Sequence, residues 1–200
     1  MEGKVDLRIK RTYKALLRTL QELLSEKSFD DITVAELCEK AEIRRATFYK
    51  HFGDKNELFA YMIQDLQRSF NEKNDISAEF EDPGRYCADA FRHFLDFLEE
   101  NERMVHTVMN SSARYIVTDI LSEQIETDLR SFFLKAKKRG TPMSFSPEML
   151  AVLYSGAAIS CARWWIINGK QVPKEEMVKQ ISDLIERISI KDADAGRQSQ

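Results

Sequence analysis

The chain has 200 residues, of which 43% are hydrophobic and 32% are charged. A chain of this length and composition can bury a hydrophobic core in one or two compact units. Its formal net charge of −3 argues against a protein that coats nucleic acid without regard to sequence.

Charge is distributed unevenly along the chain. Residues 1–18 carry six Lys and Arg against two acidic residues, so a local basic face is expected there. The N-terminus is charged where a secretory signal needs an apolar core, which argues against export. Cys38, Cys87 and Cys161 are odd in number and widely separated, so they are interpreted as free thiols of a reducing, cytoplasmic compartment.

The first predicted helix runs from about Leu7 to Ser25, with an apolar inner face that includes Tyr13. A capping box of the form T-x-x-E follows, in which Thr33 accepts from the Glu36 amide and Glu36 reaches back. A short helix begins after this cap, and a second predicted helix, Arg44–Phe52, follows almost at once. Two short helices joined by a tight turn indicate a helix-turn-helix.

The second of these helices has two contrasting faces. Phe48 and Phe52 lie one turn apart and are expected to point inward. Each residue type around the rest of the helix suits DNA: Arg45 can donate two hydrogen bonds to a guanine edge, Ala46 can contact a thymine methyl, and Thr47, Tyr49, Lys50 and His51 can hold phosphates. The helix therefore predicts a DNA-reading surface.

A second capping pattern, formed by Asp54 and Glu57, opens the next predicted helix, 54–71. The first-turn N–H groups of that helix, with Lys55 beside them, offer a further phosphate site. Polar, Pro-containing sequence over 72–83 then indicates a hinge region.

Residues 7–60 resemble the DNA-binding domain of the TetR (tetracycline-repressor) family of bacterial regulators, most closely in the segment ATFYKHFGDKNELF from Ala46 to Phe59. The resemblance implies base contacts from Arg44, Arg45 and Ala46, phosphate or mixed contacts from Thr47, Tyr49, Lys50, His51 and Lys55, and a phosphate contact from Thr33. Two positions depart from the family pattern, because Glu42 replaces a turn Gly and Arg44 replaces a frequent Ser. Glu42 must then adopt a conformation that Gly adopts more easily.

The remaining sequence is also predicted to be helical, near residues 83–100, 102–110, 113–139, 147–168 and 174–189. The expected fold is therefore all-α with about nine helices. It consists of an N-terminal three-helix helix-turn-helix DNA-binding domain (1–55), a C-terminal helical bundle for ligand binding and dimerisation (56–190) and a disordered tail (191–200). The apolar stretch Met149–Ile167 contains Arg163 and several small polar residues, which favours a core helix over a membrane span.

The last two predicted helices carry more apolar surface than a terminal helix of a small monomer needs. The family resemblance implies that they form a four-helix homodimer interface, for which the candidate residues are Tyr154, Ala158, Trp165, Ile181, Leu184 and Ile188. A purely intramolecular core is the alternative. A dimer would present two reading helices to half-sites about 34 Å apart in a palindromic double-stranded operator. The segment WWIING, 164–169, further resembles a C-terminal subfamily common in Firmicutes.

The resemblance also implies a pocket for an unknown small-molecule effector inside an aromatic and Met-rich bundle. Polar candidates for its wall are His93, His106, Asn110 and Tyr115. A ligand would act by favouring a dimer whose reading helices are wrongly spaced for the operator.

Sequence signatures of catalysis are missing. The sequence has no G-x-S-x-G, Gly-rich phosphate loop or H-E-x-x-H motif, and its three histidines are far apart. No catalytic residue, metal site or cofactor is therefore expected. The favoured interpretation is a homodimeric, ligand-responsive repressor; the alternatives are an activator or co-regulator acting through a protein partner, or a small-molecule carrier or helical enzyme in which residues 33–55 are vestigial.

Overall fold

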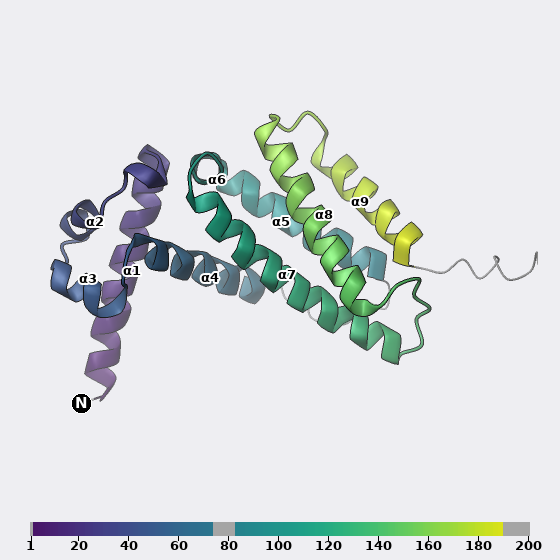
Figure 1. Ribbon diagram of the computed structural model, residues 1–200, viewed down its shortest axis with the longest axis horizontal. Coiled ribbons are helices and arrows are strands. Elements are labelled where there is room, and N and C mark those ends of the chain that lie inside the picture. The colour runs from purple at the N-terminus through teal and green to yellow at the C-terminus, as the bar shows by residue number, and fades with distance from the viewer. Residues whose placement is uncertain (1, 74–82, 190–200) are drawn as a thin grey trace, which may run out of the picture. The chain divides into compact units, whose positions relative to one another are not determined.

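The computed structural model describes residues 2–73 and 83–189, and every regular element in these two ranges is helical (Figure 1). The elements are α1 (Glu2–Glu26), the 3-10 turn η1 (Phe29–Asp31), α2 (Val34–Lys40), α3 (Arg45–His51), α4 (Lys55–Lys73), α5 (Pro83–Glu100), α6 (Glu102–Met109), α7 (Ala113–Lys138), α8 (Pro147–Ile167) and α9 (Lys174–Ser189). The expected all-α fold is confirmed. Helix ends agree with the sequence prediction to within a few residues, apart from the earlier start of α1. Most of the expected hinge and the expected tail at 191–200 lie outside the described residues.

The chain divides into two compact units. Unit 1 contains residues 1–73 and 101–120, and unit 2 contains residues 74–100 and 121–200. Helix α4, which follows the expected domain boundary at residue 55, packs within unit 1. Helix α7 starts in unit 1 and continues into unit 2.

The core of unit 1 forms around the inner face of α1. Its fully buried residues are Leu16, Leu20, Leu23 and Leu24 on α1, Phe29 and Ile32 beside η1, Leu37 on α2, Phe48 on α3, and Leu58 and Phe59 on α4. The rings of Phe29 and Phe59 are 4.9 Å apart. Burial of these side chains fixes α2 and α3 against α1, because each buried Leu or Phe contributes about 1.5–3 kcal/mol.

In unit 2, helices α5, α8 and α9 pack against one another, and α7 supplies further aromatic side chains. The ring of Tyr86 on α5 stacks on Phe132 of α7 with centroids 4.0 Å apart. Burial raises the pKa of Tyr86 to about 12. Two clusters of ion pairs around Lys174 and Arg92 also join α9 to α5.

Among the described helices, α8 is the one long and apolar enough to cross a membrane by length and composition alone. Its two faces differ. One face, which includes Leu150, Tyr154 and Trp165, is buried within the unit. The other face is exposed.

Candidate nucleic-acid interface

The first helix of the candidate site begins at the predicted N-cap. The Thr33 Oγ1 accepts a hydrogen bond from the Glu36 N–H at 3.2 Å, which confirms half of the expected capping box. The other half is wrong, because the Glu36 carboxylate accepts from the Lys27 ammonium at 2.6 Å instead. The Lys27 ammonium adds a full positive charge that the amide N–H lacks, so the carboxylate binds it more strongly. The same bond lowers the pKa of Glu36.

The turn between α2 and α3 contains the backbone conformation that the sequence comparison implied. Glu42 has φ +55°, in the left-handed region that favours glycine. The Ile43 N–H donates to the Cys38 carbonyl at 2.9 Å, and the Glu42 N–H donates to the Glu39 carbonyl at 3.1 Å. These two bonds close a Schellman motif, in which the residue after the C-cap is usually Gly. The motif ends α2 at Lys40 and lets α3 start at Arg45 (Figure 1).

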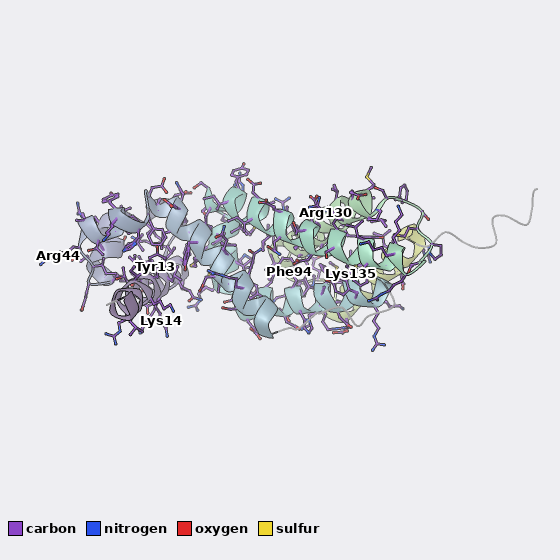
Figure 2. All side chains as sticks on the ribbon, turned by 90° about the horizontal axis from the view of Figure 1, so that it is seen from below. Tyr13, Lys14, Arg44, Phe94, Arg130 and Lys135 are labelled. Carbon is purple, nitrogen blue, oxygen red and sulfur yellow. The ribbon has the colours of Figure 1, made fainter. Side chains whose placement is uncertain are left out.

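Helix α3 separates its buried and exposed residues as expected. Phe48 and Phe52 are 0% and 3% exposed, and they hold the helix on the core of unit 1. The exposed side chains are those of Arg44, Arg45, Ala46, Tyr49 and Lys50, while Thr47 and His51 are half-buried. We call these seven residues the α3 edge. Arg44 is the N-cap but makes no side-chain capping bond, and its side chain extends away from the ribbon (Figure 2).

An aromatic cluster supports the C-terminal end of α3. The Tyr13 ring of α1 lies 5.3 Å from the His51 ring and 5.0 Å from the Phe52 ring, with Tyr61 of α4 also 5.0 Å away. Burial, with smaller contributions from Tyr61 and Glu57, raises the pKa of Tyr13. The apolar periodicity of α1 predicts Tyr13 on its inner face but does not predict the contact with His51. That contact depends on how α1 crosses α3, which the periodicity of either helix does not specify.

Lys55 has partners that the sequence did not predict. Its ammonium donates to the carbonyls of Phe29, Asp30 and Ile32 at 2.8, 3.0 and 2.8 Å and lies 4.7 Å from the centre of the Phe29 ring. These bonds use all three of its N–H donors. The geometry therefore places the Lys55 charge on η1 and gives no support to the expected direct phosphate contact.

The start of α4 is capped largely as predicted. The Asp54 Oδ1 accepts from the N–H groups of Asn56 and Glu57 at 2.8 and 2.9 Å. The Glu57 carboxylate, however, accepts from the Gly53 N–H at 2.6 Å, one residue before the expected position. These three bonds fix the chain that leaves α3.

The basic N-terminal segment forms part of α1. Lys10, Arg11 and Lys14 are exposed, and Arg18 pairs with Glu22 at 2.8 Å. The exposed cations lie on the same helix as Tyr13, which contacts α3 (Figure 2). Unit 1 thus carries positive charge on α1 as well as on α3.

Comparison with known proteins agrees with this geometry. Residues 16–62 match the family described as "Bacterial regulatory proteins, tetR family", and residues 87–187 match the family described as "Transcriptional regulator C-terminal region". The chain belongs to the TetR family of transcriptional regulators. Its helix-turn-helix and its C-terminal region are those of DNA-binding transcriptional regulators.

Curated relatives of this TetR-family chain are also described as transcriptional regulators. The chain is 26% identical over 186 residues to the uncharacterized HTH-type regulator YxbF of Bacillus subtilis, covering 92% of this chain but 47% of that protein. It therefore spans about half the length of YxbF. It is also 25% identical to IcaR of Staphylococcus aureus, the negative transcriptional regulator of the biofilm operon icaADBC, over 66% of this chain and 75% of IcaR.

Solved structures show the same fold. A TetR-family regulator from Syntrophomonas wolfei superimposes with a TM-score of 0.71 at 15% identity, covering 88% of this chain and 94% of that chain. FadR from Bacillus subtilis, solved with stearoyl-CoA, superimposes with a TM-score of 0.68 at 14% identity, covering 86% and 97%.

The four effector-pocket candidates are divided between the units. His93 lies in unit 2, and its Nδ1 is buried without a hydrogen-bond partner among the described residues. The other three lie in unit 1: the His106 Nε2 is 3.8 Å from Glu102, Asn110 donates to the His106 carbonyl at 3.0 Å, and Tyr115 is 62% exposed. Neither unit by itself brings the four together, and a shared pocket stays a prediction.

Three of the six candidate dimer-interface residues are buried within their own chain. Tyr154, Trp165 and Ile181 are 5%, 1% and 8% exposed, because the apolar stripes of α8 and α9 that carry them face the core of unit 2. The Trp165 indole also donates to the Val172 carbonyl at 2.6 Å. Ala158 is half-buried and Leu184 is 43% exposed, while the Ile188 side chain lies outside the described residues. The exposed α8 face, which comprises Met149, Val152, Leu153, Gly156, Ser160, Arg163, Trp164 and Ile167, is apolar apart from Ser160 and Arg163 and is the face available to a partner.

Proposed function

We propose that this TetR-family protein is a homodimeric, sequence-specific repressor in the cytoplasm that leaves its palindromic operator when a small molecule binds. The α3 edge carries this proposal. It places two guanidinium groups, a methyl group, a phenol and an ammonium on one short helix, with no ion pair to the described residues. Such a surface fits base edges and phosphates in a major groove.

Recognition of a palindromic operator requires a second copy of the chain. A single seven-residue reading helix contacts few base pairs, whereas two related by a two-fold axis read two half-sites. The exposed α8 face supports this, because large apolar side chains recur along it at helical spacing around Gly156 and Ser160. Small residues at such positions let two helices approach closely.

Repression and ligand release are the finer parts of the proposal. The similarity to IcaR, a negative transcriptional regulator, supports repression. An effector that couples to operator binding by 1–3 kcal/mol would weaken it about 5- to 150-fold. Transcription from a template that carries the selected operator, measured with and without protein, tests the sign: a fall supports a repressor, whereas a rise supports the alternative of an activator.

Selection of bound fragments from a random DNA pool tests DNA recognition directly. We expect the wild-type protein to retain a palindromic site with an affinity that falls steeply as salt rises. Arg45→Ala should relax the preference at one base position and cost about 1–3 kcal/mol there, while Lys50→Ala should weaken binding to all sequences and reduce the salt slope by about 1. Lys135→Ala, an exposed cation on α7, is the matched control. A wild-type dimer that retains no site would favour a small-molecule carrier with a vestigial helix-turn-helix.

A further inference from the structure

A hydrogen-bonded contact joins η1 to the start of α7 within unit 1. The Asp30 carboxylate accepts from the Ser112 N–H at 3.2 and 3.3 Å and also from the Ser112 hydroxyl. The two residues are 82 positions apart in sequence. The contact therefore connects the segment that precedes the helix-turn-helix with the α6–α7 turn.

Asp30 supplies a hydrogen-bond acceptor and a negative charge at the N-terminus of α7. The first N–H groups of a helix lack partners within the helix, and the helix dipole favours an anion beside them. Ser111 satisfies one of them locally, because its hydroxyl accepts from the Ala113 N–H at 3.3 Å. The Ser112 N–H is satisfied by Asp30. A residue of the DNA-binding segment thus caps α7, a 26-residue helix that continues into unit 2.

The same short turn is held from its other side by Lys55. The Lys55 ammonium donates to the carbonyls of Phe29, Asp30 and Ile32. Lys55 is the first residue of α4 and lies four positions after the end of α3. Thr33, which caps α2, follows Ile32 directly. Any displacement of η1 therefore reaches α2 through the backbone and the end of α3 through Lys55.

We propose that Asp30 and Ser112 form a latch through which the position of α7 sets the arrangement of the helix-turn-helix, with Lys55 as the second anchor of the same turn. With the latch closed, η1 has one position, and α2 and α3 are pre-organised for the groove. With the latch open, η1 gains freedom, and operator binding must restore the order at a cost in affinity. Asp30 and Ser112 are positioning residues, since neither belongs to the α3 edge. The inference rests on the proposed DNA-binding function and adds the route by which that function is regulated.

A double-mutant cycle tests the latch. Asp30→Ala, Ser112→Ala and the combined variant are measured for binding to a duplex that the wild-type protein selected from a random pool. We expect each single variant to weaken binding by about fivefold or more, in the range of allosteric coupling, and the combined variant to be no weaker than the worse single one. The salt slope should stay at the wild-type value, because no phosphate contact is lost. Ser112→Thr, which keeps the hydroxyl, should restore most of the affinity.

Two controls separate the latch from loss of charge and loss of stability. Asp31→Ala removes the neighbouring exposed carboxylate of η1, which makes no hydrogen bond or ion pair with the described residues, and should leave the affinity within twofold of wild type. Ser111→Ala removes the local cap of α7 and should lower the melting temperature while leaving operator affinity unchanged.

The possible failures are distinguishable. A wild-type protein that selects no duplex overturns the proposed function itself. If the wild type binds but Asp30→Ala and Ser112→Ala bind as well or better, or if their effects add independently, the latch is wrong while the function stands. An equal loss of affinity in Ser111→Ala would also overturn it, because instability of α7 would then account for the result.

Discussion

At the scale of single residues, Glu42 occupies the least favourable backbone position in the helix-turn-helix. Its φ of +55° is required by the Schellman motif that ends α2. A non-glycine residue in this region costs of order 1 kcal/mol or more. Because the surrounding turn is otherwise hydrogen-bonded, the backbone strain is confined to Glu42.

Glu42→Gly should therefore stabilise the protein. We expect the free energy of unfolding to rise by about 0.5–1 kcal/mol, since the relief of strain exceeds the entropy that Gly adds to the unfolded chain. Urea denaturation at fixed pH measures this. The control is Glu39→Gly, which places Gly inside α2 and should lower stability by about 1 kcal/mol. A loss of stability in Glu42→Gly as well would contradict the strain argument.

Lys50 and Lys55 make a second test at the residue scale, because the two ammonium groups have different surroundings. Lys50 is exposed on the α3 edge, whereas Lys55 bonds three carbonyls. We expect Lys50→Ala to lower the salt slope of operator binding by about 1. Lys55→Ala should lower the melting temperature and the affinity without changing that slope. Titration of binding against salt decides between them, and a reduced slope in Lys55→Ala would restore Lys55 to the phosphate contacts.

At the scale of elements, α9 is held on α5 by charge as well as by apolar packing. The Lys174 ammonium bonds both Asp96 and Glu99, the latter at 2.8 Å. These bonds raise the pKa of Lys174. Lys174 therefore stabilises the folded state in full at any pH below the pKa of lysine in the unfolded chain, near 10.4. This stabilisation is lost only when the pH rises through the higher pKa of Lys174 in the folded chain. The clamp holds throughout the physiological range.

Lys174→Ala should loosen this helix pair. Removal of the cation leaves two carboxylates one turn apart without their partner, so we expect a loss of about 1 kcal/mol in the free energy of unfolding, smaller at high salt. Lys179→Ala, an exposed lysine on the same helix, should change stability by less than about 0.5 kcal/mol. Denaturation at two salt concentrations provides the measurement, and equal effects of the two substitutions would refute the clamp.

At the scale of the whole molecule, the proposed dimer places the exposed α8 face between two chains. Gly156 lies on this face, and a Cβ built there meets no heavy atom within 4 Å beyond its chain neighbours and the nearby backbone of its own helix. Within the subunit a larger residue is therefore tolerated. Between two subunits whose helices approach to about 8–10 Å, it would collide.

Gly156→Leu should consequently leave the fold intact and break the dimer. Its helix content and melting behaviour as a monomer should match or exceed wild type, because Gly is a poor helix former, while sedimentation should show one chain where wild type shows two. Operator affinity should fall with the dimer. Ser131→Leu, an exposed position on α7, is the control. A Gly156→Leu protein that sediments as two chains would exclude this face as the interface.

The sequence by itself determined the helices, the N-cap residues Thr33 and Asp54 and the helix-turn-helix. These are local properties. Thr33 caps α2 because its hydroxyl lies beside the first N–H groups of the helix, and Phe48 is buried because it and Phe52, one turn apart, form one apolar face. The strain at Glu42 was also evident, since one residue replaced an expected Gly in a turn of known geometry.

Only the tertiary structure decided which partner each long side chain selects. Lys55 and Asp30 turn to η1 and to Ser112 because segments distant in sequence are brought within hydrogen-bond distance of them. Likewise, both faces of α8 are apolar, so hydrophobic periodicity alone does not indicate which face is buried. The packing of α8 against α5 and α9 buries Tyr154 and Trp165 and leaves Trp164 exposed.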